Sequence, residues 1–208
     1  FQQSRYSADL MTLTLFGPQS LDEQQAWVEI MFAEIPNHQL RGKSIDVPIN
    51  TEESTGILVQ VEPIKELRKL ILTFPMPGMD AHYSVKPLSY FAHLLGYEGR
   101  GSLMLQLKEK GWITSLSAGG GASGSNYRDF TVSCTLTPRG LDCIDDIVQA
   151  VFQYLTMIKQ DGMDEWRYKE KQAVLESAFR FQEPSRPMDL VSHLAVSYTH
   201  LRAHETHE

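Results

Sequence analysis

The sequence lacks the features that define membrane-spanning and nucleic-acid-binding proteins. The 208-residue sequence contains no run of about 18 apolar residues, which a membrane helix requires. Lys and Arg are also few, 19 against 26 Asp and Glu, which gives a net charge of -7. Nucleic-acid affinity is built mostly from Lys and Arg, so we expect neither a nucleic acid nor a membrane as partner. The 42% hydrophobic content excludes disorder and predicts a globular chain of one or two domains.

Cysteine is scarce as well, and its spacing indicates neither a metal site nor a redox pair. The two residues are Cys134 and Cys143, and a chain of this size does not need a disulfide to fold. We therefore expect both to be free, buried, apolar side chains.

The two ends of the chain are unusual. It starts at Phe1, without Met or a signal-like apolar region, which predicts a chain cut at its front. His200 and His204 have the spacing of one helix face, but neither H-E-x-x-H nor H-x-x-E-H occurs, so we expect no metal site. Because three of the seven His lie in the last nine residues, we interpret residues 197–208 as an anomalous tail that is a sequence artefact.

Hydrophobic periodicity and turn residues predict the order of helices and strands. The S-x-x-E pattern at Ser20 and Glu23 is a capping box, and Ser84 is a plausible N-cap ahead of Pro87. The predicted strands are 6–16, 56–62, 69–74, 112–118 and 127–137, and the predicted helices are 20–36, 84–95, 102–110, 138–162 and 165–182. Gly-rich residues 119–126 are predicted to form a turn or loop between two strands.

This order of elements predicts an α+β fold with a largely antiparallel sheet covered on one face by helices. The strand 127–137 is the clearest, because Phe130, Val132, Cys134 and Leu136 alternate with polar residues and so share one face.

The chemical motifs of the common enzyme classes are absent or out of context. Gly119, Gly121 and Gly124 match G-x-G-x-x-G, but a strand follows them where a dinucleotide site needs a helix. There is no G-x-S-x-G elbow, and the Asp145–Asp146 pair is typical of a solvated helix face. The sequence therefore contains no complete catalytic constellation.

Several longer stretches nevertheless resemble one family. They are FQQSRYSADLM at the front, VEPIKELRKLILTFPMP, YFAHLLGYEGRGSLMLQLKEKGW, and FQYLTMIKQDGMDEW with FRFQEPSRP. Together, over residues 1–196, they resemble the insulinase, or pitrilysin-type (M16), zinc metallopeptidases. The resemblance implies four homologous α+β domains that form two halves of a closable chamber.

The resemblance also implies how this chain divides. Residues 1–36 would be the last strand and helix of the first, catalytic domain, and residues 37–54 a linker. Residues 55–196 would be most of the second, non-catalytic domain, ahead of the tail at 197–208. The zinc motif H-x-x-E-H of the family belongs to the first domain, so we expect no catalytic residue and no metal ligand here. Zinc would be bound only in the full-length enzyme.

For the second domain the resemblance implies a site that anchors the N-terminal end of a peptide substrate while the first domain cuts elsewhere. The matching positions in this sequence are His93, Gly96, Tyr97, Leu116, Ser117, Ala118 and Gly119. Tyr97 stands where a second His is usual and Ala118 where Gly is usual, so paired imidazoles are not expected.

The expected function is therefore part of a zinc-dependent metalloendopeptidase that degrades peptides, with the remaining M16 domains of the same chain as partners. A non-catalytic scaffold or core-subunit member that binds a protein partner is the alternative. Bacterial relatives are periplasmic, which assigns a compartment only by analogy.

Overall fold

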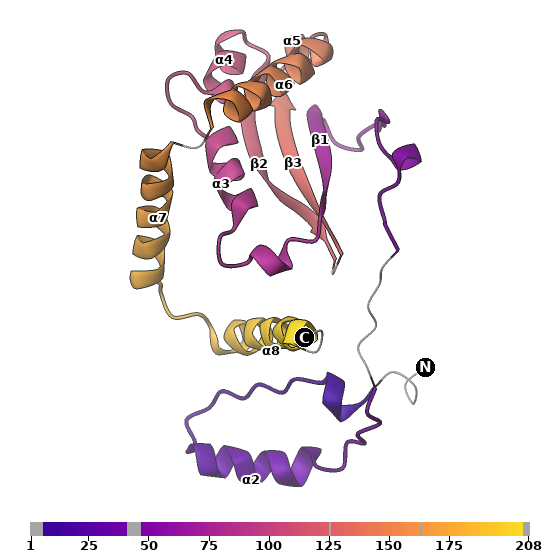
Figure 1. Ribbon diagram of the computed structural model, residues 1–208, viewed down its shortest axis with the longest axis vertical. Helices are drawn as coiled ribbons and strands as arrows, with labels where there is room; N and C mark the ends of the chain where they lie inside the picture. Colours follow the sequence, from indigo (N-terminus) through magenta and orange to yellow (C-terminus); the bar gives the residue numbers. More distant parts are fainter. Residues whose placement is uncertain (1–5, 41–46, 125, 163, 206–208) are drawn as a thin grey trace. The chain divides into compact units, whose positions relative to one another are not determined.

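The computed structural model describes residues 6–40, 47–124, 126–162 and 164–205. The chain forms two compact units, one of residues 1–44 with 181–208 and one of residues 45–180 (Figure 1). The domain bounds expected above, including the linker at 37–54, stay a prediction, and part of that linker lies outside the described residues. The interpretation of residues 197–208 as an artefact also stays a prediction, and residues 206–208 lie outside the described residues.

The unit of residues 45–180 is built on a three-stranded antiparallel sheet. Its strands are β1 (Lys69–Pro77), β2 (Ile113–Ser123) and β3 (Tyr127–Leu136), and β3 lies in the centre in the order β1-β3-β2. Val132 of β3 is opposite Leu72 on one side and Ala118 on the other. The antiparallel sheet and the α+β class are confirmed.

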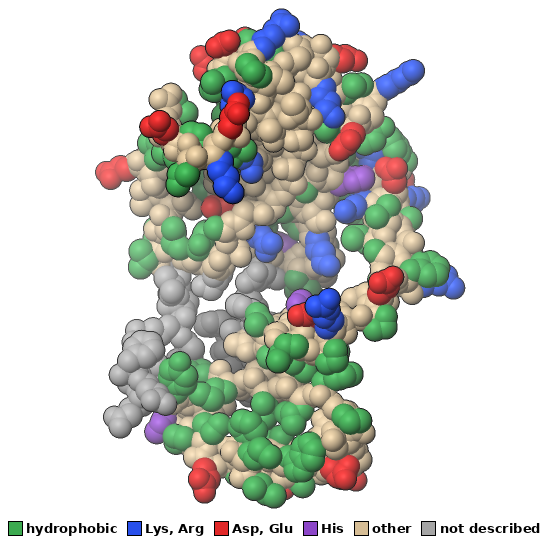
Figure 2. Space-filling view, turned by 180° about the vertical axis from the view of Figure 1, so that it is seen from behind, with side chains coloured by type: hydrophobic (Ala, Val, Ile, Leu, Met, Phe, Trp, Pro, Cys, Tyr) green, Lys and Arg blue, Asp and Glu red, His purple; other side chains and the backbone are tan. Residues whose placement is uncertain are grey.

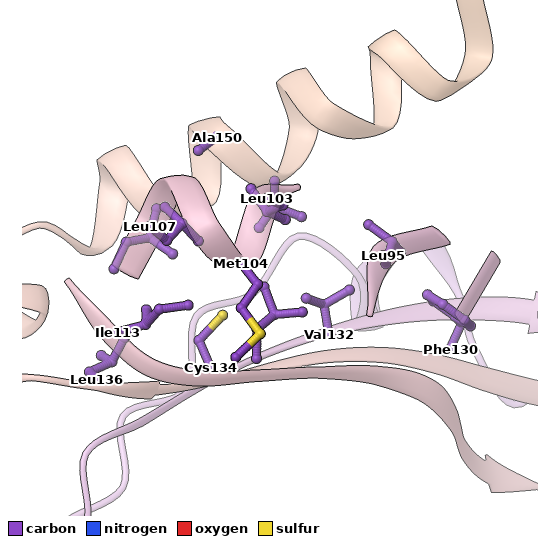
Figure 3. Packing of buried hydrophobic residues seen from close by; sticks show 13 residues of the cluster. Leu95, Leu103, Met104, Leu107, Ile113, Phe130, Val132, Cys134, Leu136 and Ala150 are labelled. Atoms are coloured by element: carbon purple, nitrogen blue, oxygen red, sulfur yellow. The ribbon is translucent and has the colours of Figure 1, made fainter. Parts of the chain in front are cut away.

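Helices of the same unit cover one face of this sheet (Figures 1 and 3). The covering helices are α3 (Pro87–Leu95), α4 (Leu103–Glu109) and α6 (Ile144–Asp161). The short α5 (Pro138–Leu141) follows β3 and contacts it, and α7 (Glu165–Arg180) packs against α3. Apolar residues of α3, α4 and α6 form a core with alternate residues of β3, which are Phe130, Val132, Cys134 and Leu136 as the sequence predicts (Figure 3). The opposite sheet face carries Ser and Thr side chains such as Ser115, bonded to Thr135.

The other unit contains a short 3-10 helix η1 (Ala8–Leu10) and two α-helices, α2 (Leu21–Phe32) and α8 (Pro187–Glu205). The capping box is present: Ser20 Oγ accepts from Glu23 N at 3.3 Å, and Ser20 N donates to Glu23 Oε2 at 3.0 Å. No residue of α2 is buried, and apolar side chains gather over this unit (Figure 2). Two further 3-10 turns, η2 (Glu52–Ser54) and η3 (Asp80–His82), belong to the larger unit.

Two predicted strands are wrong. Residues 6–16 hold η1 and an extended segment, and residues 56–62 are irregular; neither segment pairs with a strand among the described residues. Branched aliphatic side chains favour extended backbone, but a strand forms only where a neighbour completes its hydrogen bonds. Ile57, Leu58, Val59 and Val61 are all exposed as a result.

Three boundaries also need correction. Residues 119–123 are not a loop, because β2 continues through them. Ser84 does not cap α3; the N-cap is Lys86, in the left-handed region with φ 45°. The helix expected over 138–162 breaks at Asp142 and Cys143 into α5 and α6.

The two cysteines are both free. Cys134 is buried as expected, whereas Cys143 is only half-buried.

Candidate functional site

The edge of β2 is the first component of the candidate site. Among the described residues β2 pairs only with β3, so its other edge has no strand partner. Leu136 N donates to Arg68 O, on the β1 side, and Thr137 N donates to Trp112 O, on the β2 side. Backbone groups alternate in direction along a strand, so Ser115, Ser117 and Gly119 bond to β3.

The outward backbone groups therefore belong to Leu116, Ala118 and Gly120. Of the four β2 positions expected from the resemblance, Leu116 has its side chain in the core, at 7% exposure, and can offer only its backbone. Ser117 and Gly119 direct their backbone groups toward β3. Gly120 is a position that sequence reasoning missed, because it was placed in a loop.

The C-terminal end of α3 is the second component. Helix α3 packs against β2 (Figure 1), and His93, Gly96 and Tyr97 lie at the C-terminal end of this helix. Gly96 is the C-cap, and its N–H donates to Ala92 O at 2.9 Å. The last carbonyls of a helix carry partial negative charge, so this end favours a cation.

Helix α7 contributes charged groups to this end. His93 Nε2 lies 3.6 Å from Glu170 Oε2, and the Arg167 guanidinium lies 5.9 Å from the centre of the Tyr97 ring. Arg167 is itself paired with Asp164 at 3.0 Å, so its charge is largely compensated. Nothing in the sequence pointed to Glu170, because α7 lies more than seventy residues after His93.

Tyr90 and Tyr154 are both close enough to Arg167 for its charge to act on their phenols. The Tyr90 hydroxyl is buried with no hydrogen-bond partner among the described residues, and its ring packs against Tyr168 at 6.2 Å. Burial raises the pKa of the Tyr90 phenol, while Arg167 lowers it and Asp164 raises it to smaller extents. Burial likewise raises the pKa of Tyr154. Both phenols are therefore neutral near pH 7 and act as packing groups.

The described residues do not assemble a metal centre. No group of three or more His, Cys, Asp and Glu among them is placed to hold an ion. No described helix is long and apolar enough to cross a membrane. What the arrangement offers is an open strand edge beside a helix end of negative potential, which suits binding of an extended chain with a positive terminus.

Comparison with known families identifies the domain. Residues 1–175 match the family model described as the peptidase M16 inactive domain. The chain belongs to this family. The expected resemblance and its α+β fold class are thereby confirmed.

This M16 chain is similar to parts of several longer curated proteins. It is 36% identical to insulin-degrading enzyme of Drosophila melanogaster over 95% of the chain and 20% of that protein. It is 35% identical to A-factor-processing enzyme of Saccharomyces cerevisiae over 94% of the chain and 19% of that protein. Nardilysin of Rattus norvegicus is 33% identical over 93% of the chain and 17% of that protein. The chain thus spans about a fifth of the length of these relatives.

Solved structures agree on the fold. Pitrilysin matches with a TM-score of 0.83 and 26% identity, over 88% of this chain and 20% of that one. The first half of a periplasmic protease of Escherichia coli matches with a TM-score of 0.59 and 14% identity, over 88% and 40% of the two chains, and so supports the fold alone.

Proposed function

We propose that this chain is the non-catalytic second domain of a zinc-dependent metalloendopeptidase that degrades peptides. In this proposal the remaining M16 domains of the longer protein hold the zinc and carry out hydrolysis. The present domain contributes part of the chamber wall and anchors the N-terminal end of the substrate. Zinc, when bound by those domains, would activate the attacking water.

The open edge of β2 is the observation that supports this proposal most. A peptide that adds to a sheet edge is held by main-chain hydrogen bonds, which give affinity with little dependence on side chains. Leu116, Ala118 and Gly120 each direct an N–H and a C=O outward by the alternation established above. Such a site suits a peptidase that accepts many sequences.

The terminus of the peptide would lie at the C-terminal end of α3. There the terminal carbonyls of the helix and the Glu170 carboxylate, 3.6 Å from His93, supply negative potential for an ammonium group. This arrangement replaces the pair of imidazoles usual in the family, since Tyr97 occupies the second position.

The test is kinetic and uses the full-length protein that contains this chain. Ala118→Pro removes one outward N–H from the edge, a position where proline leaves the β2–β3 ladder intact. Ala118→Gly keeps the N–H and is the matched control. We expect Ala118→Pro to raise KM about fivefold for a peptide long enough to reach β2, as loss of one hydrogen bond of about 1 kcal/mol implies.

A short peptide that spans only the cleavage site should show an unchanged KM in both variants. Equal KM increases for long and short peptides in Ala118→Pro would contradict anchoring at β2. A full-length protein that hydrolyses no peptide, with its zinc site loaded, would instead favour the non-catalytic scaffold.

A further inference from the structure

A cavity of about 290 Å³ lies at the opposite end of α3 from His93. Its described lining includes His82 and Lys86 ahead of α3, Leu88 and Ser89 in its first turn, and Arg128 at the start of β3. Nothing in the proposed anchoring of a peptide N-terminus uses this cavity.

The charges that line the cavity are all of one sign. Lys86 and Arg128 are cationic, His82 adds a third basic side chain, and none of the described lining residues is acidic. No described side chain forms an ion pair with Lys86 or Arg128. In a chain of net charge -7 these two cations are therefore available to an anionic ligand.

Arg128 connects the cavity to the strand edge. Its Nη2 lies 3.3 Å from the point where a Cβ on Gly120 would stand, so the guanidinium lies against the backbone of β2. Gly120 pairs with Phe130, whose side chain points into the core beneath the helices, so Arg128 lies over that face of the sheet (Figure 3). Because Arg128 both lines the cavity and lies against Gly120, the cavity is close to the outward N–H and C=O of Gly120.

The distance between the two ends of α3 sets a register for a bound peptide. The nine residues from Pro87 to Leu95 span about 13 Å at 1.5 Å per residue. An extended peptide advances about 3.3 Å per residue, so about four residues cover this distance.

We propose that this cavity binds the carboxylate of an Asp or Glu side chain at the fourth or fifth residue of the peptide anchored on β2. The inference rests on the proposed function, since it places the peptide terminus beside His93. Arg128 and Lys86 hold the carboxylate, and Met79 and Leu88 contact the methylene groups of the acidic side chain. The site would disfavour Lys or Arg at the same residue.

The experiment is a charge scan in the full-length protein. A single Glu is placed in turn at residues two to seven of an otherwise uncharged long peptide, with Gln at the same place as the reference. We expect KM to fall about tenfold for Glu at residue four or five, as one charge-assisted hydrogen bond implies. Adjacent residues of an extended chain face opposite ways, so only one of the two should respond.

Arg128→Gln should abolish this preference, so that the Glu and Gln peptides have equal KM. Arg139→Gln is the matched control, because Arg139 is an exposed residue of α5 outside the cavity and the charge change is the same. A Glu preference that survives Arg128→Gln, or a flat scan, would overturn the proposal.

Two further measurements distinguish failure of the acidic subsite from failure of peptide anchoring at β2. Ala118→Pro tested on the uncharged peptide reports on the anchoring alone, so a flat scan with an intact Ala118→Pro effect contradicts only the acidic subsite. Inorganic phosphate is then added as a competitor: competition confined to Glu peptides supports a shared carboxylate site. Inhibition of all peptides alike, lost in Arg128→Gln, would assign the cavity to a free anion and overturn the proposal.

Discussion

At the scale of single residues, Gly140 joins α5 to the sheet by close backbone contact. A Cβ there would overlap the carbonyl oxygen of Trp112, which accepts from Thr137 N at 3.0 Å. Gly140→Ala should therefore destabilise the protein by about 2 kcal/mol through overpacking. Thermal unfolding measures the loss. Gly119→Ala is the control, because a Cβ there meets nothing within 4 Å, and an equal loss in both variants would refute the explanation.

Cys134 gives a second prediction at this scale. Its burial raises the pKa of the thiol to about 11 from 9.0, which keeps the thiol neutral. Titration with a thiol reagent at pH 8 should modify the half-buried Cys143 and leave Cys134 unmodified until the protein unfolds.

The same shift links stability to pH. A raised pKa in the folded state favours folding below pH 9, and this contribution is lost between about pH 9 and pH 11 as the unfolded thiol ionises first. Cys134→Ala should lack that part of the pH dependence. Rapid modification of Cys134 in the native protein at pH 8 would contradict its burial.

Residue types explain which parts of the site the sequence could predict. The alternation of Phe130, Val132, Cys134 and Leu136 identified the buried face of β3, because burial and strand periodicity are both local signals. Gly120 and Arg128 could not be found in this way. Their roles depend on which strand is the edge and which side chains converge from distant elements, and no local pattern encodes that.

At the scale of elements, substitutions of two serines check which residues cap the N-termini of α3 and α4. Ser102 is 2% exposed, and its hydroxyl accepts from Leu105 N at 3.1 Å. Ser102→Ala should cost about 1 kcal/mol of stability through loss of the N-cap of α4. Ser84→Ala is the control, since Ser84 does not cap α3, and its effect should be close to zero. The free energies of unfolding of the two variants distinguish these assignments.

The glycine run shows why element boundaries were harder to predict than element types. Glycine is depleted in strands and common in turns, so residues 119–126 were expected to leave the sheet. In the structure Gly119 and Gly120 pair with Thr131 and Phe130, and the partner strand overrides the local preference. The unpaired residues 56–62 show the reverse, where a strong local preference for strand has no partner among the described residues.

At the scale of the whole molecule, residues 57–61 should drive association of the isolated 208-residue chain. Ile57, Leu58, Val59 and Val61 are between 66% and 79% exposed, and an exposed extended apolar segment is an association site. Val59→Lys should lower the light scattering of the chain. Val85→Lys, at a residue that is 62% exposed but outside this segment, should change it little. Equal effects would show that added charge alone suppresses association.

The central claim is that the β2 edge holds the peptide independently of the chemical step. The most direct measurement is equilibrium binding of a labelled long peptide to the full-length protein after its zinc has been removed by a chelator. We expect a dissociation constant about fivefold higher for Ala118→Pro and unchanged for Ala118→Gly, as loss of one main-chain hydrogen bond requires. Equal affinity of the wild-type protein and Ala118→Pro would contradict it.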